Sequence, residues 1–102
     1  MFGWLNRRGE AAVIRQQLTM CDAIADGVKA LLPDIEAALR LRPGEPRLIG
    51  VLRYLEKAQS LMMECRHLSL ADQVLDSSET DDLMATIQQL IYIQQLATTA
   101  KQ

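Results

Sequence analysis

Residues 14–39 read IRQQLTMCDAIADGVKALLPDIEAAL. Apolar and small residues recur in this stretch at alternating spacings of four and three, which is the heptad pattern of a helix packed along one face. The members of this stripe are Ile14, Leu18, Cys21, Ala25, Val28, Leu32, Ile35 and Leu39. Pro33 removes a helical hydrogen bond but leaves the stripe in phase, so we expect a kink or a short break near Leu32.

The residues that follow this stretch predict a helical hairpin. Residues 42–47 read RPGEPR, and their two prolines and one glycine should end the first helix and start a second one at Pro46. From Leu48 to Cys65 apolar residues occupy one side of a helical wheel and charged residues the other. Because the turn is short, we expect the segment from Leu18 to Val28 to pack antiparallel against residues 55–65.

A last helix is expected from roughly Thr80 to Thr99, and it carries no charged residue from Leu83 through Ala100. One apolar face of this helix consists of Leu83, Met84, Ile87, Leu90 and Ile91. A second apolar face consists of Ala85, Tyr92, Ile93 and Leu96. A helix in a small bundle buries one main face, so this second face predicts a protein partner or a homodimer. Alternatively, a short helix over residues 69–75 packs on this second face within the same chain.

Length and composition agree with one small domain spanning residues 1–102. Only four residues are aromatic, so Leu, Ile, Val, Met and Ala must build the core, and these residues favour helices. We therefore predict an all-α fold, an antiparallel three- to four-helix bundle, with residues 1–8 as a flexible N-terminal segment.

Charge and hydropathy narrow the classes of partner. The net charge is −2, which disfavours binding to nucleic acid, and no apolar run is long enough to span a membrane. Phe2, Trp4 and Leu5 precede two arginines and could make weak peripheral contact with a membrane surface. Three arginines in residues 40–47 contrast with five acidic residues between Asp72 and Asp82, and a hairpin would place these groups at opposite ends.

Groups that could carry chemistry are few. Cys65 and His67, with Glu64 beside them and Cys21 elsewhere, match no standard zinc spacing, and no nucleophile–base pair or phosphate-binding loop is visible. We predict no catalytic residue, no cofactor and no metal site, and buried, reduced thiols at Cys21 and Cys65 in a cytoplasmic protein. A small helical enzyme or a metal-binding regulator using His67 and its neighbours is the alternative.

The stretch from Ala37 to Leu48 resembles two kinds of helix–helix joint. It is similar to the Pro-punctuated joint of tetratricopeptide-type repeats, and its Pro-x-x-Pro turn looks like that of the hairpin-shaped needle subunits of type III secretion systems. Both families bind or assemble proteins, so the resemblance implies an interaction function. We therefore expect a small non-enzymatic adaptor, chaperone or assembly factor, with a connection to secretion as one possibility, that self-associates through its C-terminal helix.

Overall fold

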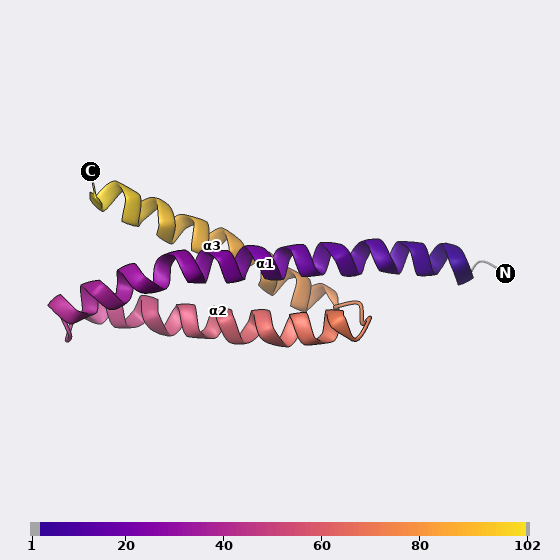
Figure 1. The fold of residues 1–102 in the computed structure, drawn as a ribbon, viewed down its shortest axis with the longest axis horizontal. Coiled ribbons are helices and arrows are strands. Elements are labelled where there is room, and N and C mark those ends of the chain that lie inside the picture. Colours follow the sequence, from indigo (N-terminus) through magenta and orange to yellow (C-terminus); the bar gives the residue numbers. More distant parts are fainter. Residues whose placement is uncertain (1–2, 102) are drawn as a thin grey trace.

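The computed structural model describes the backbone of residues 3–101 and the side chains of residues 9–99. Three helices account for nearly all of this part of the chain: α1 (Gly3–Leu41), α2 (Pro46–Leu70) and α3 (Ser77–Lys101). In Figure 1, α1 and α2 run antiparallel as a long hairpin, and α3 crosses α1 obliquely. The molecule is a rod, 62 × 24 × 19 Å.

The two ends of α2 are fixed by local hydrogen bonds. Pro46 occupies the first turn, where its missing N–H removes no helical bond, and the Glu45 side chain accepts from the Arg47 N–H. At the other end, the Asp72 N–H donates to the Ser69 carbonyl and the Gln73 N–H donates to the Leu68 carbonyl. These are the two bonds of a Schellman motif, and they require the left-handed φ of 60° that Asp72 adopts.

The start of α3 is set by a reciprocal capping box. The Glu79 N–H donates to the Asp76 carboxylate at 2.7 Å, and the Asp76 N–H donates to the Glu79 carboxylate at 3.1 Å. Because this box places the N-cap at Asp76, α3 begins at Ser77, three residues earlier than the start expected at Thr80.

The buried stripe of α1 differs in part from the stripe expected from the sequence. The buried side chains of α1 among the described residues are Ile14, Gln17, Cys21, Ile24, Val28, Leu31 and Ile35, and Gly27 is buried as well. Positions 14, 21, 28 and 35 agree with the expectation, but Leu18, Ala25 and Leu32 are only half-buried. The true stripe alternates spacings of three and four, and it is rotated because it must face α2 and α3 together.

Other features of the chain also depart from the expected ones. Pro33 lies inside a continuous α1, so the expected break is absent and a local kink there stays a prediction. Within the expected flexible segment 1–8, the backbone is helical from Gly3; Phe2 and the side chains of Trp4 and Leu5 lie outside the described parts. Residues 69–75 form no fourth helix, because Ser69 and Leu70 complete α2 and a non-helical connector follows.

Two side-chain contacts between α1 and α2 fix the register of the hairpin. The Gln17 amide donates to the Ser69 hydroxyl at 3.0 Å, and Arg66 pairs with Asp22 at 2.7 Å. In this register Cys21 lies level with Cys65, since each is one helical turn from the Gln17–Ser69 contact. Both cysteines belong to one hydrophobic core to which all three helices contribute. The predicted antiparallel packing of the segment from Leu18 to Val28 against residues 55–65 is confirmed.

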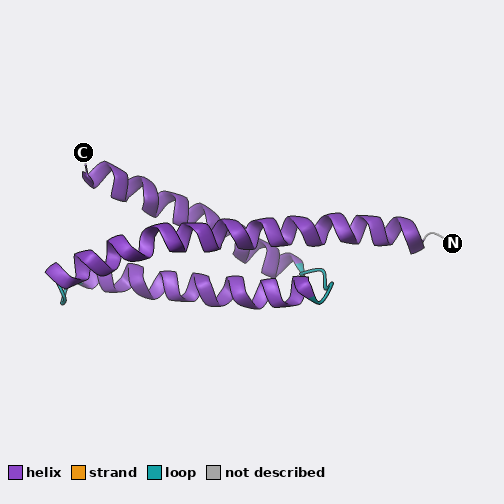
Figure 2. Cartoon of the chain, viewed as in Figure 1, coloured by secondary structure: helices purple, strands orange, loops and turns teal. Residues whose placement is uncertain are grey.

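α3 packs mainly on α1 and meets α2 only near its own start. Gly27 allows α3 to approach α1 closely, because a Cβ built there would lie 3.2 Å from Leu90 Cδ1 and 3.5 Å from Leu90 Cβ. The two connectors, teal in Figure 2, lie at opposite ends of the hairpin, and α3 diverges from it toward its C-terminus. The second half of α3 therefore has little of the protein around it.

Candidate protein-binding surface on α3

A buried polar network holds the α2–α3 connector on α1 and so positions the start of α3. Gln17 Nε2 donates to the Ser69 hydroxyl at 3.0 Å and to the Gln73 carbonyl at 3.1 Å, while Gln17 Oε1 accepts from the Leu75 N–H at 2.8 Å. The Ser69 hydroxyl in turn donates to the Cys65 carbonyl at 2.7 Å. Every donor and acceptor of the Gln17 amide is satisfied, although its side chain is only 2% exposed.

α3 contributes one narrow stripe to the core. Leu83, Thr86 and Leu90 are buried, and Ile93 and Ala97 continue the same spacing as half-buried residues packed against the core. The Thr86 hydroxyl donates to the Asp82 carbonyl one turn back, which removes the cost of burying it. Ile93, which the sequence predicts on the second apolar face with Tyr92 and Leu96, therefore lies at the edge of the core.

The outer face of α3 is the side formed by Ala85, Gln88, Tyr92, Gln95, Leu96 and Thr99. It carries three of the four residues expected to bind a partner. Tyr92 is 54% exposed and Leu96 is 52% exposed, and Ala85 is also exposed on the same side of the helix. Met84 and Ile91 are exposed on the opposite flank of the buried stripe, although the sequence suggested that they face the core. α3 thus presents large apolar side chains on both flanks of a narrow buried stripe.

The polar residues between these apolar side chains carry no charge. Gln88, Gln95 and Thr99 lie on the outer face and are exposed. An exposed glutamine or threonine costs less to desolvate in an interface than a lysine or a glutamate does. The composition of this face therefore matches the core of a protein–protein interface more closely than an ordinary solvated helix face.

A shallow groove accompanies the start of this face, where α3 separates from α2. Its volume is about 340 Å³, and it is lined by Tyr54, Lys57, Ala58, Leu61, Asp82, Ala85 and Thr86. Ala85 is therefore both exposed and part of a concavity. The groove contains one basic and one acidic residue and no nucleophile that is paired with a base.

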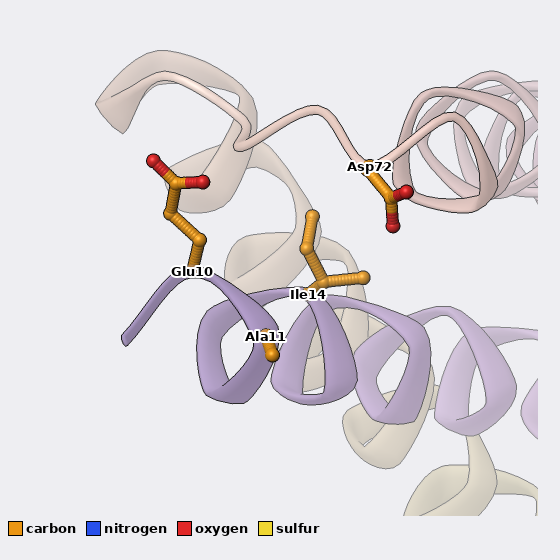
Figure 3. Close-up of a pocket in the computed structure, with 4 residues that line it drawn as sticks. All are labelled: Glu10, Ala11, Ile14 and Asp72. Atoms are coloured by element: carbon orange, nitrogen blue, oxygen red, sulfur yellow. The ribbon is translucent and has the colours of Figure 1, made fainter. Parts of the chain in front are cut away.

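A second hollow, of about 270 Å³, lies between α1 and the α2–α3 connector. Figure 3 shows the carboxylate side chains of Glu10 and Asp72 on either side of Ile14, with Ala11 on the same helix. Both carboxylates belong to exposed residues, and the residues lining the hollow include no thiol, hydroxyl, histidine or basic side chain for them to act with. This arrangement supplies no recognisable catalytic group.

The Cys65–His67 pair does not converge on a common point. Cys65 is 1% exposed and lies in the core, whereas His67 is exposed on α2. Burial raises the pKa of the Cys65 thiol to about 11, and burial also raises the pKa of Cys21, with partial opposition from Arg66. Both thiols are free, buried and protonated at neutral pH, and a protonated thiol is neither a nucleophile nor a metal ligand.

Within the part of the chain that the structure describes, no group of three or more His, Cys, Asp or Glu residues is placed to hold a metal ion. None of the helices over the same residues is long and apolar enough to cross a membrane.

Comparison of the chain with protein-family models, with curated proteins and with solved structures gave no match.

Proposed function

We propose that this protein is a small non-enzymatic interaction module that self-associates through α3, acting as an adaptor, a chaperone or an assembly factor. The observation that carries the proposal is the exposed, uncharged outer face of α3, with Tyr92 and Leu96 each more than half exposed. Burying such side chains between two copies removes apolar surface from water at no cost in desolvated charge.

The shape of the molecule supports this assignment over catalysis. α3 lies across α1 and leaves the hairpin toward its own C-terminus, so a second protein can reach the outer face of α3 without moving the core (Figure 1). The buried free thiols fit a reducing compartment, and we propose the cytoplasm as the location. The turn sequence that resembles helical joints of assembling proteins agrees with an assembly role, including one in secretion.

The proposal is tested by replacing Tyr92 and Leu96 together with glutamate and measuring the mass in solution by sedimentation. Ile93 is left unchanged, because it packs against the core and a charge there would unfold the protein. We expect the wild-type protein to be a dimer and the double variant to dissociate at least about 100-fold more readily, since two charges would have to be buried.

Met63→Glu is the control for a carboxylate introduced elsewhere on the surface, because Met63 is 59% exposed on α2 and lies outside the proposed face. This variant should remain as dimeric as the wild-type protein, with unchanged helical content. A wild-type protein that stays monomeric at high concentration would overturn self-association, and equal effects of the two sets of substitutions would overturn the assignment to α3.

A further inference from the structure

The two ends of the α1–α2 hairpin carry opposite charge, and the structure shows where each group lies. The basic tip consists of Arg40, Arg42 and Arg47, all exposed around the α1–α2 turn, with Glu45 as the one acidic residue among residues 40–47. The acidic end consists of Asp72, Asp76, Glu79, Asp81 and Asp82 at the α2–α3 connector and the start of α3, a stretch without a basic residue. The two connectors lie at opposite ends of the hairpin (Figure 2).

α3 runs from the acidic end toward the end of the rod that carries the basic tip (Figure 1). The direction in which two copies of α3 pair therefore decides which charges meet. A parallel pair sets acidic end beside acidic end and basic tip beside basic tip. An antiparallel pair sets each basic tip at the same end as the acidic end of the other copy, which replaces repulsion with attraction at both ends.

We infer that two copies of this chain pair through α3 in antiparallel orientation about a twofold axis near Tyr92. This inference rests on the proposed self-association through α3 and adds the partner's orientation. Tyr92 lies midway between Ala85 and Thr99 on the outer face, so an axis there places Ala85 of each copy level with Thr99 of the other. Such a pair is isologous and closed, and it leaves no unpaired copy of the surface for further growth.

The charges act on orientation more than on the strength of the dimer. Charged groups on the surface are screened over about 8 Å at physiological salt, whereas the apolar contact between the outer faces is not screened. The dimer should therefore weaken only moderately as salt rises. The affinity lost at high salt should be the contribution of the attraction between the basic tip and the acidic end.

Cysteine cross-linking reads the orientation directly. Ala85→Cys and Thr99→Cys variants are prepared separately and oxidised alone and as an equal mixture, with Cys21 and Cys65 left in place because both are buried. Residues 85 and 99 are 14 positions apart, about 21 Å along a helix, so the two orientations give different products. We expect a covalent dimer in the mixture and little in either variant alone.

Charge reversal at the basic tip is the second measurement. Arg40→Glu with Arg42→Glu should weaken dimerisation at least about tenfold at 50 mM salt, and the difference should shrink at 500 mM as the ends are screened. Lys29→Glu with Arg53→Glu is the control, because it changes the net charge by the same amount at exposed residues that lie outside both charged ends and outside the groove beside Ala85. This control should alter the affinity far less.

The outcomes separate the two proposals. Efficient linkage within each cysteine variant alone would show a parallel pair and overturn the antiparallel orientation, while self-association through α3 would stand. Equal effects of the tip variant and its control would overturn the role of the ends. A protein without any dimer, by sedimentation and by cross-linking, would overturn both proposals.

Discussion

The α1–α2 hairpin and α3 bury very different shares of their apolar residues. In the hairpin, apolar positions repeat at heptad spacing on both helices, and the register set by Gln17 and Ser69 brings the two stripes together along most of their length. Among the described side chains of α3, Leu83, Thr86 and Leu90 are buried, while Met84, Ile91, Tyr92 and Leu96 are about half exposed. The hairpin is stabilised within one chain, whereas α3 retains apolar surface that a second molecule can cover.

The largest effect on the free energy of unfolding is expected from a leucine of the hairpin, and a leucine of α3 serves as the comparison. Leu55 is 1% exposed in the hairpin, and Leu55→Ala should lower the free energy of unfolding by about 2–5 kcal/mol through lost burial and the cavity it leaves. Leu96→Ala on α3 should change the stability of the monomer by less than about 0.5 kcal/mol. Urea denaturation at low protein concentration measures both. A large loss from Leu96→Ala would mean that the outer face is part of the core.

A second comparison tests the polar network that joins the two regions. Gln17→Ala removes the acceptor of the Leu75 N–H and should lower the free energy of unfolding by about 1–3 kcal/mol, because that buried donor loses its partner. Gln16→Ala, at an exposed position of the same helix, is the control and should have little effect. Equal denaturation midpoints for the two variants would show that the connector does not depend on Gln17.

The smallest changes in stability are expected at two glycines inside helices, and the two changes should have opposite signs. Gly50→Ala on α2 should stabilise the protein by about 0.5–1 kcal/mol, since alanine favours the helix and nothing lies within 4 Å of the new Cβ. Gly27→Ala should instead destabilise it by about 1 kcal/mol, because its Cβ would press on Leu90 and displace α3 from α1. Thermal denaturation of the two variants gives the sign of each change. A gain from Gly27→Ala would mean that α3 is not closely packed on α1.

Much of the fold could be predicted from the sequence, because helical periodicity and turn residues act locally. The Pro-Gly turn, the hairpin and the last helix follow from such signals. The position of the core stripe on α1 did not follow from these signals, because Ile24 and Ala25, like Leu31 and Leu32, are adjacent apolar or small residues between which only the packing of α2 and α3 decides. The polar Gln17 shares heptad spacing with Ile14, Cys21 and Ile24. A polar residue at a heptad position was the available signal for a buried hydrogen-bonding side chain.

The outer face of α3 was predicted in outline and not in detail. Its two apolar faces were visible on a helical wheel, and Tyr92, Leu96 and Ala85 are indeed exposed. Ile93 is half-buried at the edge of the core, which a helical wheel cannot predict because the rotation of a helix depends on the helices packed against it. The capping box at Asp76 was readable as a D-x-x-E pattern and sets the start of α3.

The hydrogen bond between Leu75 and Gln17 makes one backbone amide a reporter of how α3 is attached. Leu75 lies outside every helix, so its N–H has no helical acceptor and is shielded from solvent only while the connector rests on α1. Its hydrogen exchange should be slow in spite of its loop position, and the rate measures how often α3 and its connector lift away from the hairpin. A partner that holds α3 in place would slow this exchange without touching Leu75 itself.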